Sequence, residues 1–270
     1  MMRKLIISFL SVVVLAVLGY VLYLMWREPK LIYHPDRTPF ITPAGITDLN
    51  LTASDGVPIH GWFIPAPAAK VTVLFLHGNA GNLWNRRAKI AILLDAGAEV
   101  CAIDYRGYGR SGGTPSEAGT YRDARAAYDY LTKTMNRSPH NIVVYGESLG
   151  TAVTVELATH VPVGGVVLEE AFTSVRDAWQ KLLPLSPVAR WLVRNRYDTL
   201  QKINRLSAPL LIFHTRQDEF FPIQNAERLL AAAPEPKQLV ELQGGHNDAF
   251  WTSRVIYRQA LWQFFNQLPR

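Results

Sequence analysis

The sequence predicts an α/β fold in which a mostly parallel sheet is flanked by helices, with a small helical cap over the sheet and one transmembrane helix at the N-terminus. Three observations lead to this fold class. Apolar, β-branched runs alternate with helical patterns over most of the chain, which is typical of strands buried on both faces of a parallel sheet. One long segment with two prolines interrupts the alternation. An uncharged stretch near the N-terminus is long enough to cross a bilayer.

The composition limits the number of domains and the kinds of partner. A chain of 270 residues, with 49% hydrophobic and 19% charged residues, suits one large domain with appendages. The net charge is +6, but Lys and Arg are scattered, so we expect no nucleic-acid partner. A basic surface near anionic lipid headgroups and an ordinary solvated surface both stay open. The one cysteine, Cys101, excludes an intramolecular disulfide and is expected to be buried; the oligomeric state is not predicted.

The N-terminal stretch Leu5–Trp26 contains no charged residue and is rich in Leu, Val and Ile. As a helix it spans roughly 33 Å, enough for a hydrocarbon core of about 30 Å. We therefore expect a membrane anchor at residues 1–28 and a connector at 29–44. A cleaved signal peptide is the alternative, because Arg3 and Lys4 form a basic n-region. The apolar run is longer than an ordinary signal peptide's, however, and no small-residue cleavage site follows it.

Charges on the two sides of this stretch predict its orientation. Arg3, Lys4 and the α-amino group lie on one side, and Arg27, Glu28 and Lys30 on the other. This small asymmetry favours an N-terminus in the cytoplasm. The following domain would then lie on the non-cytoplasmic side, which is the periplasm in a bacterium.

Residues 45–270 are expected to form the main domain. It opens with two short strands, Leu49–Ala53 and Ile59–Ile64, joined as a hairpin at Asp55 and Gly56. Reactive loops should lie at the carboxyl ends of the parallel strands that follow. These buried strands are predicted at Val71–Leu76, Val100–Ile103, Ile142–Tyr145, Val163–Leu168, Leu210–Phe213 and Gln238–Leu242.

The clearest helical pattern begins at Thr114, where Pro115 suits the first helical position and Glu117 the capping box. The residues that would face the core are spaced by three and four. They are Ala124, Ala127, Tyr128, Leu131 and Met135.

Residues 172–207 are too long for one crossover helix and are broken by Pro184 and Pro187. With Trp179, Trp191 and several leucines among basic residues, they predict a small helical cap inserted over the sheet. A decorated crossover that packs on the body of the domain is the alternative.

A glycine-bounded serine follows the strand Ile142–Tyr145, in the order Gly146, Glu147, Ser148, Leu149, Gly150, and a helix-compatible stretch comes next. This context of strand, turn and helix makes the motif specific for a nucleophile on a strained turn. The glycines remove side chains that would collide where strand and helix approach each other. Ser148 is therefore the candidate nucleophile, and a plain glycine turn is the alternative.

A serine hydroxyl needs a histidine base and a carboxylate that orients the imidazole. His246 follows the last strand in a glycine-rich loop and is the candidate base. Asp218, in the loop after Leu210–Phe213, is the candidate acid and completes the order Ser, Asp, His. The rival acids are Glu219, Glu169, Glu170 and Asp248, while His77 and His214 end buried strands and are expected to be structural.

A tetrahedral intermediate also needs donors for its oxyanion. One candidate is the backbone N–H of Leu149, directly after the nucleophile. The second is expected in the loop after Val71–Leu76, where Asn79 is the first choice and Ala80 the second.

Several of these motifs occur together in a known family. On them, the chain from about residue 45 resembles the α/β-hydrolases. With its N-terminal anchor it is similar to the Bem46-like, ABHD13-type membrane-anchored serine hydrolases, a resemblance that implies hydrolase chemistry without naming a substrate. The motifs are His77–Asn82, Asp104–Gly112, Gly146–Gly150, Asp218 with Pro222, and His246.

The expected function is that of a carboxylesterase acting on a small-molecule substrate, an acyl or lipid-like ester, through an acyl-enzyme on Ser148. A serine at this position argues against the dehalogenase and epoxide-hydrolase branches of the fold. A peptidase or amidase with the same triad, and a non-catalytic binding scaffold, are the alternatives. No cofactor and no metal are expected, because no dinucleotide fingerprint or metal-ligand cluster occurs in the sequence.

Overall fold

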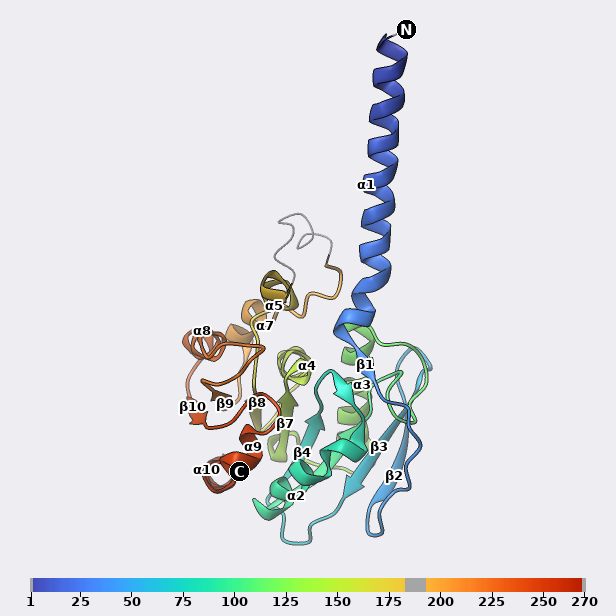
Figure 1. The fold of residues 1–270 in the computed structure, drawn as a ribbon. Helices are drawn as coiled ribbons and strands as arrows, with labels where there is room; N and C mark the ends of the chain where they lie inside the picture. The colour runs from blue at the N-terminus through green and yellow to red at the C-terminus, as the bar shows by residue number, and fades with distance from the viewer. Residues whose placement is uncertain (1, 183–192, 269–270) are drawn as a thin grey trace.

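The computed structural model describes residues 2–182 and 193–268 (Figure 1). Within them, eight strands form one sheet in the order β10-β9-β8-β7-β4-β6-β3-β2. β3 runs antiparallel to both of its neighbours, and all other neighbouring pairs are parallel, as the sequence predicts. The strands are β2 (Thr47–Thr52), β3 (Pro58–Ile64), β4 (Val71–Leu76), β6 (Ala98–Ile103), β7 (Ile142–Glu147), β8 (Gly165–Glu169), β9 (Leu210–Thr215) and β10 (Lys237–Leu242).

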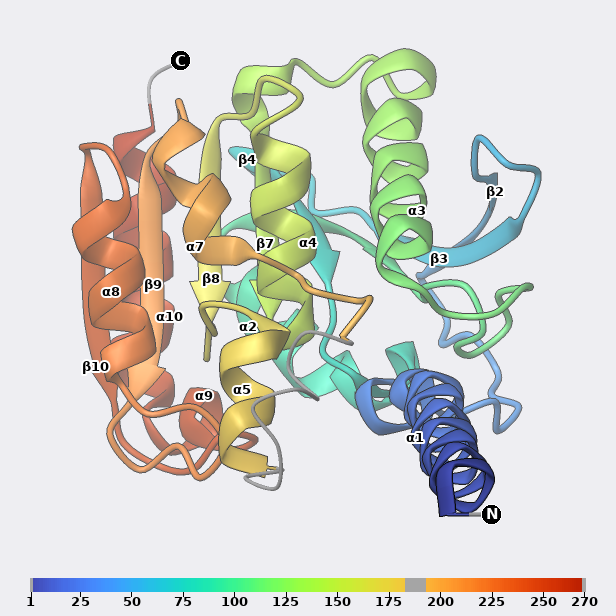
Figure 2. The same cartoon turned by 90° about the horizontal axis from the view of Figure 1, so that it is seen from above.

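Helices cover both faces of the sheet (Figure 2). One face carries α3 (Glu117–Asp129), α4 (Leu149–Ala158), α7 (Thr199–Lys202) and α8 (Gln224–Ala232), and the other carries α2 (Arg87–Asp95) and α10 (Arg254–Gln267). The shorter elements are β1 (His34–Pro35), β5 (Ala80–Gly81), η1 (Leu83–Arg86), η2 (Tyr130–Thr134), η3 (Pro139–Asn141), α5 (Val175–Leu182), η4 (Ile203–Arg205) and α9 (Ala249–Thr252).

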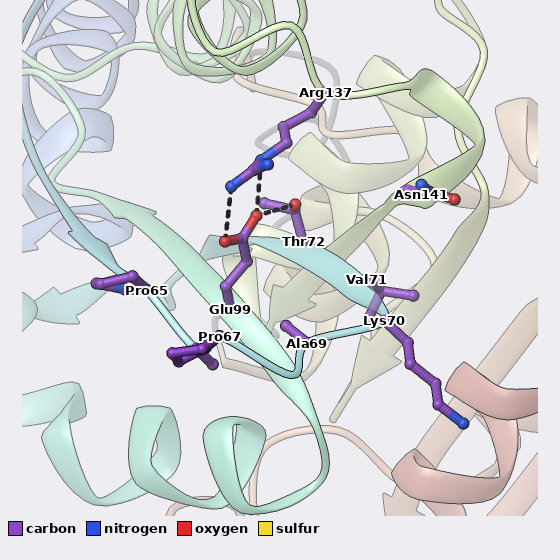
Figure 3. A pocket seen from close by; sticks show the side chains of 10 residues that line it. Pro65, Pro67, Ala69, Lys70, Val71, Thr72, Glu99, Arg137 and Asn141 are labelled. Atoms are coloured by element: carbon purple, nitrogen blue, oxygen red, sulfur yellow. Dashed lines mark hydrogen bonds and ion pairs between the residues drawn. The ribbon is translucent and has the colours of Figure 1, made fainter.

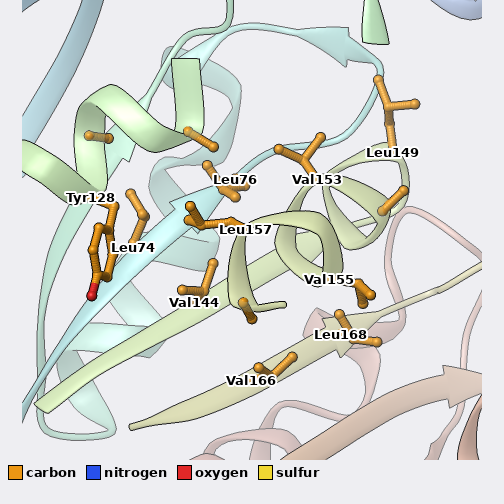
Figure 4. Close-up of a cluster of buried hydrophobic side chains, with 14 of the residues drawn as sticks. Leu74, Leu76, Tyr128, Val144, Leu149, Val153, Val155, Leu157, Val166 and Leu168 are labelled. Carbon is orange, nitrogen blue, oxygen red and sulfur yellow. The ribbon is translucent and has the colours of Figure 1, made fainter. Parts of the chain in front are cut away.

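Alternation along the strands divides the core into two clusters. In β4, Leu74 and Leu76 face α3 and α4, whereas Val73 and Phe75 face α2 and α10. Figure 4 shows part of the first cluster, in which Leu74 lies near Tyr128 of α3 and Leu76 lies near Val153 and Leu157 of α4. Cys101 is a free, fully buried thiol in β6, as predicted, and burial together with Glu99 raises its pKa to about 12.

The predicted start of α3 at Thr114 is wrong. The helix begins at Glu117, and the hydroxyl of Ser116 caps it by accepting a hydrogen bond from the Gly119 N–H at 3.2 Å. Glu117 forms no capping box, because its carboxylate accepts hydrogen bonds from backbone N–H groups near residue 196 instead. The predicted inward face is buried at Ala124, Ala127, Tyr128 and Leu131 and partly buried at Met135.

α1 (Met2–Ile32) rises from the domain as one helix whose apolar side chains are exposed (Figure 1). It is long and apolar enough to cross a membrane. The helix continues past the expected start of the connector at residue 29, although Pro29 lacks an N–H and would leave the carbonyl four residues earlier without a partner. The Arg194 guanidinium donates to that carbonyl, on Met25, at 2.9 Å.

The predicted cap lies partly outside the described residues, which exclude 183–192 with Pro184, Pro187 and Trp191. Its described ends are α5 and the segment from residue 193 to η4. Within that second part, α7 packs against α4 and α8, so this end of the segment joins the body of the domain.

Candidate active site

Ser148 lies at the turn between β7 and α4 with φ +50° and ψ −113°, a strained conformation for a residue with a side chain. Both flanking glycines are required by close backbone approach. A Cβ atom on Gly150 would lie 2.0 Å from the carbonyl oxygen of Leu76, and one on Gly146 would lie 2.4 Å from the carbonyl oxygen of Gly150. The turn therefore has the geometry that the glycine-serine motif predicts.

The structure brings the three candidate catalytic residues into one hydrogen-bonded row. His246, between β10 and α9, places Nε2 3.0 Å from Ser148 Oγ and Nδ1 2.7 Å from Asp218 Oδ2. Because Nδ1 faces a carboxylate, it carries the proton, and Nε2 is free to accept the serine proton. Asp218 also accepts hydrogen bonds from the backbone N–H groups of Phe220 and Phe221, at 2.7 and 2.8 Å.

Asp218 keeps its negative charge although its side chain is fully buried. Burial alone would raise the pKa of its carboxyl. The hydrogen bond and charge of His246, and the backbone N–H of Phe221, outweigh burial and lower the pKa below its ordinary value. The carboxylate can thus stabilise an imidazolium ion at neutral pH.

A second carboxyl group, Glu170, lies behind Asp218. It is fully buried in a left-handed conformation (φ +49°) and accepts from the Thr215 N–H at 3.3 Å. Burial, a hydrogen bond with Asp218 and nearby negative charges raise the pKa of Glu170 to about 10. Its Oε2 is 3.4 Å from Nδ1 of His214, whose Nε2 donates to the Phe221 carbonyl at 2.9 Å. Because the His214 proton is on Nε2, its Nδ1 presents a lone pair to Glu170. A protonated Glu170 carboxyl is compatible with both neighbours, the Asp218 carboxylate and His214 Nδ1.

The same three groups could hold a cation by donor type, because ligand atoms of Glu170, His214 and Asp218 lie within 4.8 Å of one another. A cation there would compete with His246 for the Asp218 carboxylate. A proton on Glu170 relieves the repulsion between the carboxyls and leaves the row intact. We therefore assign the proton to Glu170, which donates it toward the Asp218 carboxylate.

Two of the rival acids support the loop that carries His246. Glu219 accepts from the His246 backbone N–H at 3.0 Å, and Asp248 accepts from the Gly245 N–H at 2.6 Å. Neither carboxylate takes the position at the imidazole Nδ1 that Asp218 occupies.

Beneath the elbow lies a buried charge cluster that the sequence did not indicate. Lys89 pairs with Glu147 at 3.2 Å and with Glu169 at 2.8 Å, and Arg86 pairs with Glu147 at 2.9 Å. Burial would raise the pKa of Glu147, but the two cations outweigh it and lower the pKa to about 2. The residue that precedes Ser148 is thus fixed by charge.

The loop that should carry the second oxyanion donor lies beside the elbow. In the sheet register Leu76 of β4 is opposite Gly146 of β7, and a Cβ atom on Gly78 would lie 3.4 Å from Ser148 Cβ. Within the described residues, the backbone N–H groups of Leu149 and Asn79 donate no hydrogen bond, so both stay available. Ala80, the second choice, lies in β5 and pairs with β1.

Aromatic side chains form one wall of the site beside His246. The sequence analysis did not predict this wall. The rings of Phe220 and Phe221 lie edge-on to the His246 imidazole, at centroid distances of 5.0 and 5.4 Å, and Phe172 contacts Phe221 at 5.1 Å. Phe220 is 47% exposed. The sequence signal for this wall is the pair Phe220 and Phe221, which begins two residues after Asp218.

A cavity of about 300 Å³ lies at the opposite ends of the strands from Ser148, where β4 and β6 begin (Figure 3). Its buried polar groups already have partners, because Glu99 accepts hydrogen bonds from Thr72 at 2.6 Å and Arg137 at 2.9 Å. We assign no chemistry to this cavity.

Comparison with known proteins places the fold and the sequence in a family. The uncharacterized protein Rv2307c of Mycobacterium tuberculosis is 36% identical over 95% of this chain and 94% of its own length. The alpha/beta hydrolase domain-containing protein WAV2 of Arabidopsis thaliana is 33% identical over 94% of this chain and 92% of its own length. The esterase Pf2001 of Pyrococcus furiosus shares the fold with a TM-score of 0.74 at 20% identity, over 87% of this chain and 99% of the esterase. Residues 73–255 match the profile of the alpha/beta hydrolase family, and the chain belongs to that family.

Proposed function

We propose that the protein is a membrane-anchored serine hydrolase that cleaves carboxylic esters of acyl or lipid-like type. The observation that carries this proposal is the row of Ser148, His246 and Asp218 at a strained elbow. His246 takes the Ser148 proton as the serine attacks the ester carbonyl, and returns it to the leaving alcohol. The backbone N–H groups of Leu149 and Asn79 stabilise the oxyanion, and water then releases the acyl group.

Two further observations support the proposal, one the apolar acyl group and the other the ester chemistry. The aromatic wall of Phe172, Phe220 and Phe221 offers apolar surface beside the imidazole. The Pyrococcus furiosus protein with the same fold is an esterase by name.

Hydrolysis of short p-nitrophenyl esters by the purified full-length chain tests the proposal. Ser148→Ala should reduce turnover to background while the thermal unfolding temperature stays near that of the wild type. Unchanged ester turnover in this variant would refute the assignment. Parallel assays on aminoacyl and peptidyl amides would identify an amidase or peptidase instead.

We also propose that α1 stays attached as a single-pass anchor, as the resemblance to the Bem46-like subgroup implies, and that the catalytic domain lies on the non-cytoplasmic side, as the charges that flank α1 favour. Support comes from the continuity of the apolar helix with residues that pack in the domain, where Glu28, Ile32 and Tyr33 are buried. Alkaline phosphatase and cytoplasmic reporter fusions after Pro29 test the orientation. Activity of the cytoplasmic reporter alone would overturn it.

A further inference from the structure

The C-terminal end of α1, where the helix meets the catalytic domain, is held by several buried hydrogen bonds. Glu28 is 2% exposed, and its carboxylate accepts from the backbone N–H groups of Arg194 and Asn195, both at 2.8 Å. The hydroxyl of Tyr33 donates to Asn195 Oδ1 at 3.1 Å and lies 2.8 Å from the Tyr197 hydroxyl. A buried carboxylate with this many donors holds the helix end in one position.

The chain that leaves this helix end runs along the loop beside Ser148. The Asn79 side-chain amide donates to the carbonyl of Ile32 at 3.1 Å, and the His34 N–H donates to the Asn79 carbonyl at 2.9 Å. β1 then pairs with β5, and the Asp36 N–H donates to the Gly81 carbonyl at 3.2 Å. Residues 32–36 thus make repeated hydrogen bonds to the loop that follows β4.

Asn79 is the residue on which these contacts meet. Its side chain is tied to the last residue of α1, and its carbonyl accepts from both His34 and the Tyr108 hydroxyl, the latter at 2.7 Å. Its own backbone N–H makes no hydrogen bond within the described residues. Three hydrogen bonds therefore hold two polar groups of Asn79, the side-chain nitrogen and the backbone carbonyl, and the backbone N–H follows Gly78, on which a Cβ atom would lie 3.4 Å from Ser148 Cβ.

We propose that the end of α1 and residues 32–36 belong to the active-site scaffold, with the Asn79 side-chain amide as the positioning group that aims the Asn79 backbone N–H at the oxyanion. This inference rests on the proposed function. On this inference α1 does more than attach the domain to a membrane. A shift in the position of the helix end is transmitted through Ile32 and His34 to the loop that carries the Asn79 N–H.

Substitution of Asn79 should weaken the stabilisation of the transition state and therefore lower kcat. Losing an oxyanion donor outright lowers kcat by about 10²–10³-fold, and a misplacement of about 1 Å can cost about 10²-fold. Asn79→Ala keeps the backbone donor and removes one of its supports, so kcat should fall by about 10- to 100-fold with KM nearly unchanged. Asn79→Asp, which cannot donate to the Ile32 carbonyl, should lose at least as much.

The experiment uses the full-length chain in detergent micelles, with kcat and KM for a p-nitrophenyl ester and the affinity for a boronic acid that forms a tetrahedral adduct on the serine. The matched control is Asn266→Ala, which removes a side-chain amide that also donates to a backbone carbonyl, that of Trp262 at 2.6 Å, but lies in α10 outside the proposed scaffold. The control should keep kcat within about twofold, whereas Asn79→Ala should weaken boronate binding as much as it lowers kcat. Asn79→Ser, with a shorter donor, should fall between wild type and alanine.

Wild-type kcat and boronate affinity in Asn79→Ala and Asn79→Asp would overturn the inference and leave the proposed function standing. A lowered unfolding temperature in Asn79→Ala with wild-type kcat and wild-type boronate affinity would also overturn it. A folded wild type that neither hydrolyses the ester nor binds the boronate would instead refute the proposed function, and this inference with it.

Discussion

Replacing Glu170 by glutamine should change how the stability of the protein depends on pH. The glutamine amide has nearly the same shape, can still accept from the Thr215 N–H and can donate toward Asp218, but it cannot ionise. In the native wild type the pKa of Glu170 is raised from an ordinary 4.5 to about 10. A raised folded pKa contributes stability that is complete below the unfolded pKa and is lost as the pH rises through the folded pKa.

The size of the effect follows from one proton. Between about pH 5 and pH 9 the native wild type holds one proton more than the unfolded chain at this group, which lowers its stability by about 1.4 kcal/mol per pH unit. From pH 6 to pH 8 the wild type should lose about 3 kcal/mol through Glu170, and Glu170→Gln should lose none of it. For a domain of this size the difference corresponds to roughly 5–10 °C in Tm.

The assay is thermal unfolding of both proteins in the same detergent from pH 6 to pH 8, in steps of half a unit. The Tm of Glu170→Gln minus that of the wild type should increase steadily with pH. Glu241→Gln, which removes a half-exposed carboxyl at the surface, is the control and should follow the wild type. Parallel curves for wild type and Glu170→Gln would refute the proton on Glu170, and curves that become parallel only with an added divalent metal would indicate a cation site.

Three other substitutions test the surroundings of the nucleophile. Gly150→Ala puts a Cβ atom 2.0 Å from a backbone carbonyl and should abolish accumulation of folded protein, measured by size-exclusion chromatography; a folded, active variant would contradict the packing of the elbow. Lys89→Met leaves Glu147 and Glu169 without their shared cation and should destabilise the fold by about 3–5 kcal/mol in chemical unfolding, whereas an unchanged midpoint would show that the cluster is not coupled to stability. Asp218→Asn should preserve the fold and lower kcat by about 10⁴-fold, because the imidazole loses its orienting carboxylate, and a loss below tenfold would mean that another carboxylate serves.

The strands and the candidate site were predictable because their signals are local. Continuous β-branched runs such as Val71–Leu76 mark strands buried on both faces, and the structure places β4 over those same residues. The serine motif between strand and helix, and the order Ser148, Asp218, His246, led us to expect three side chains that the structure places in one hydrogen-bonded row, and their catalytic role stays a prediction.

Where the predictions were wrong or silent, contacts between distant parts of the chain decide the structure. Glu117 forms no capping box because its carboxylate bonds to backbone some 80 residues away, and no local pattern contains this information. α1 continues past Pro29 because Arg194 satisfies the carbonyl that proline leaves without a partner. The buried partnership of Glu170 with Asp218 likewise arises only when neighbouring strand ends meet at one edge of the sheet.

Labelling with a fluorophosphonate probe, followed by peptide mass spectrometry, tests the central claim that Ser148 is an activated nucleophile. The account predicts one probe per folded wild-type chain, attached to Ser148, with no labelling of Ser148→Ala and a strongly reduced rate in His246→Ala. Folded wild-type protein that stays unlabelled, or that carries the probe on another residue, would contradict it.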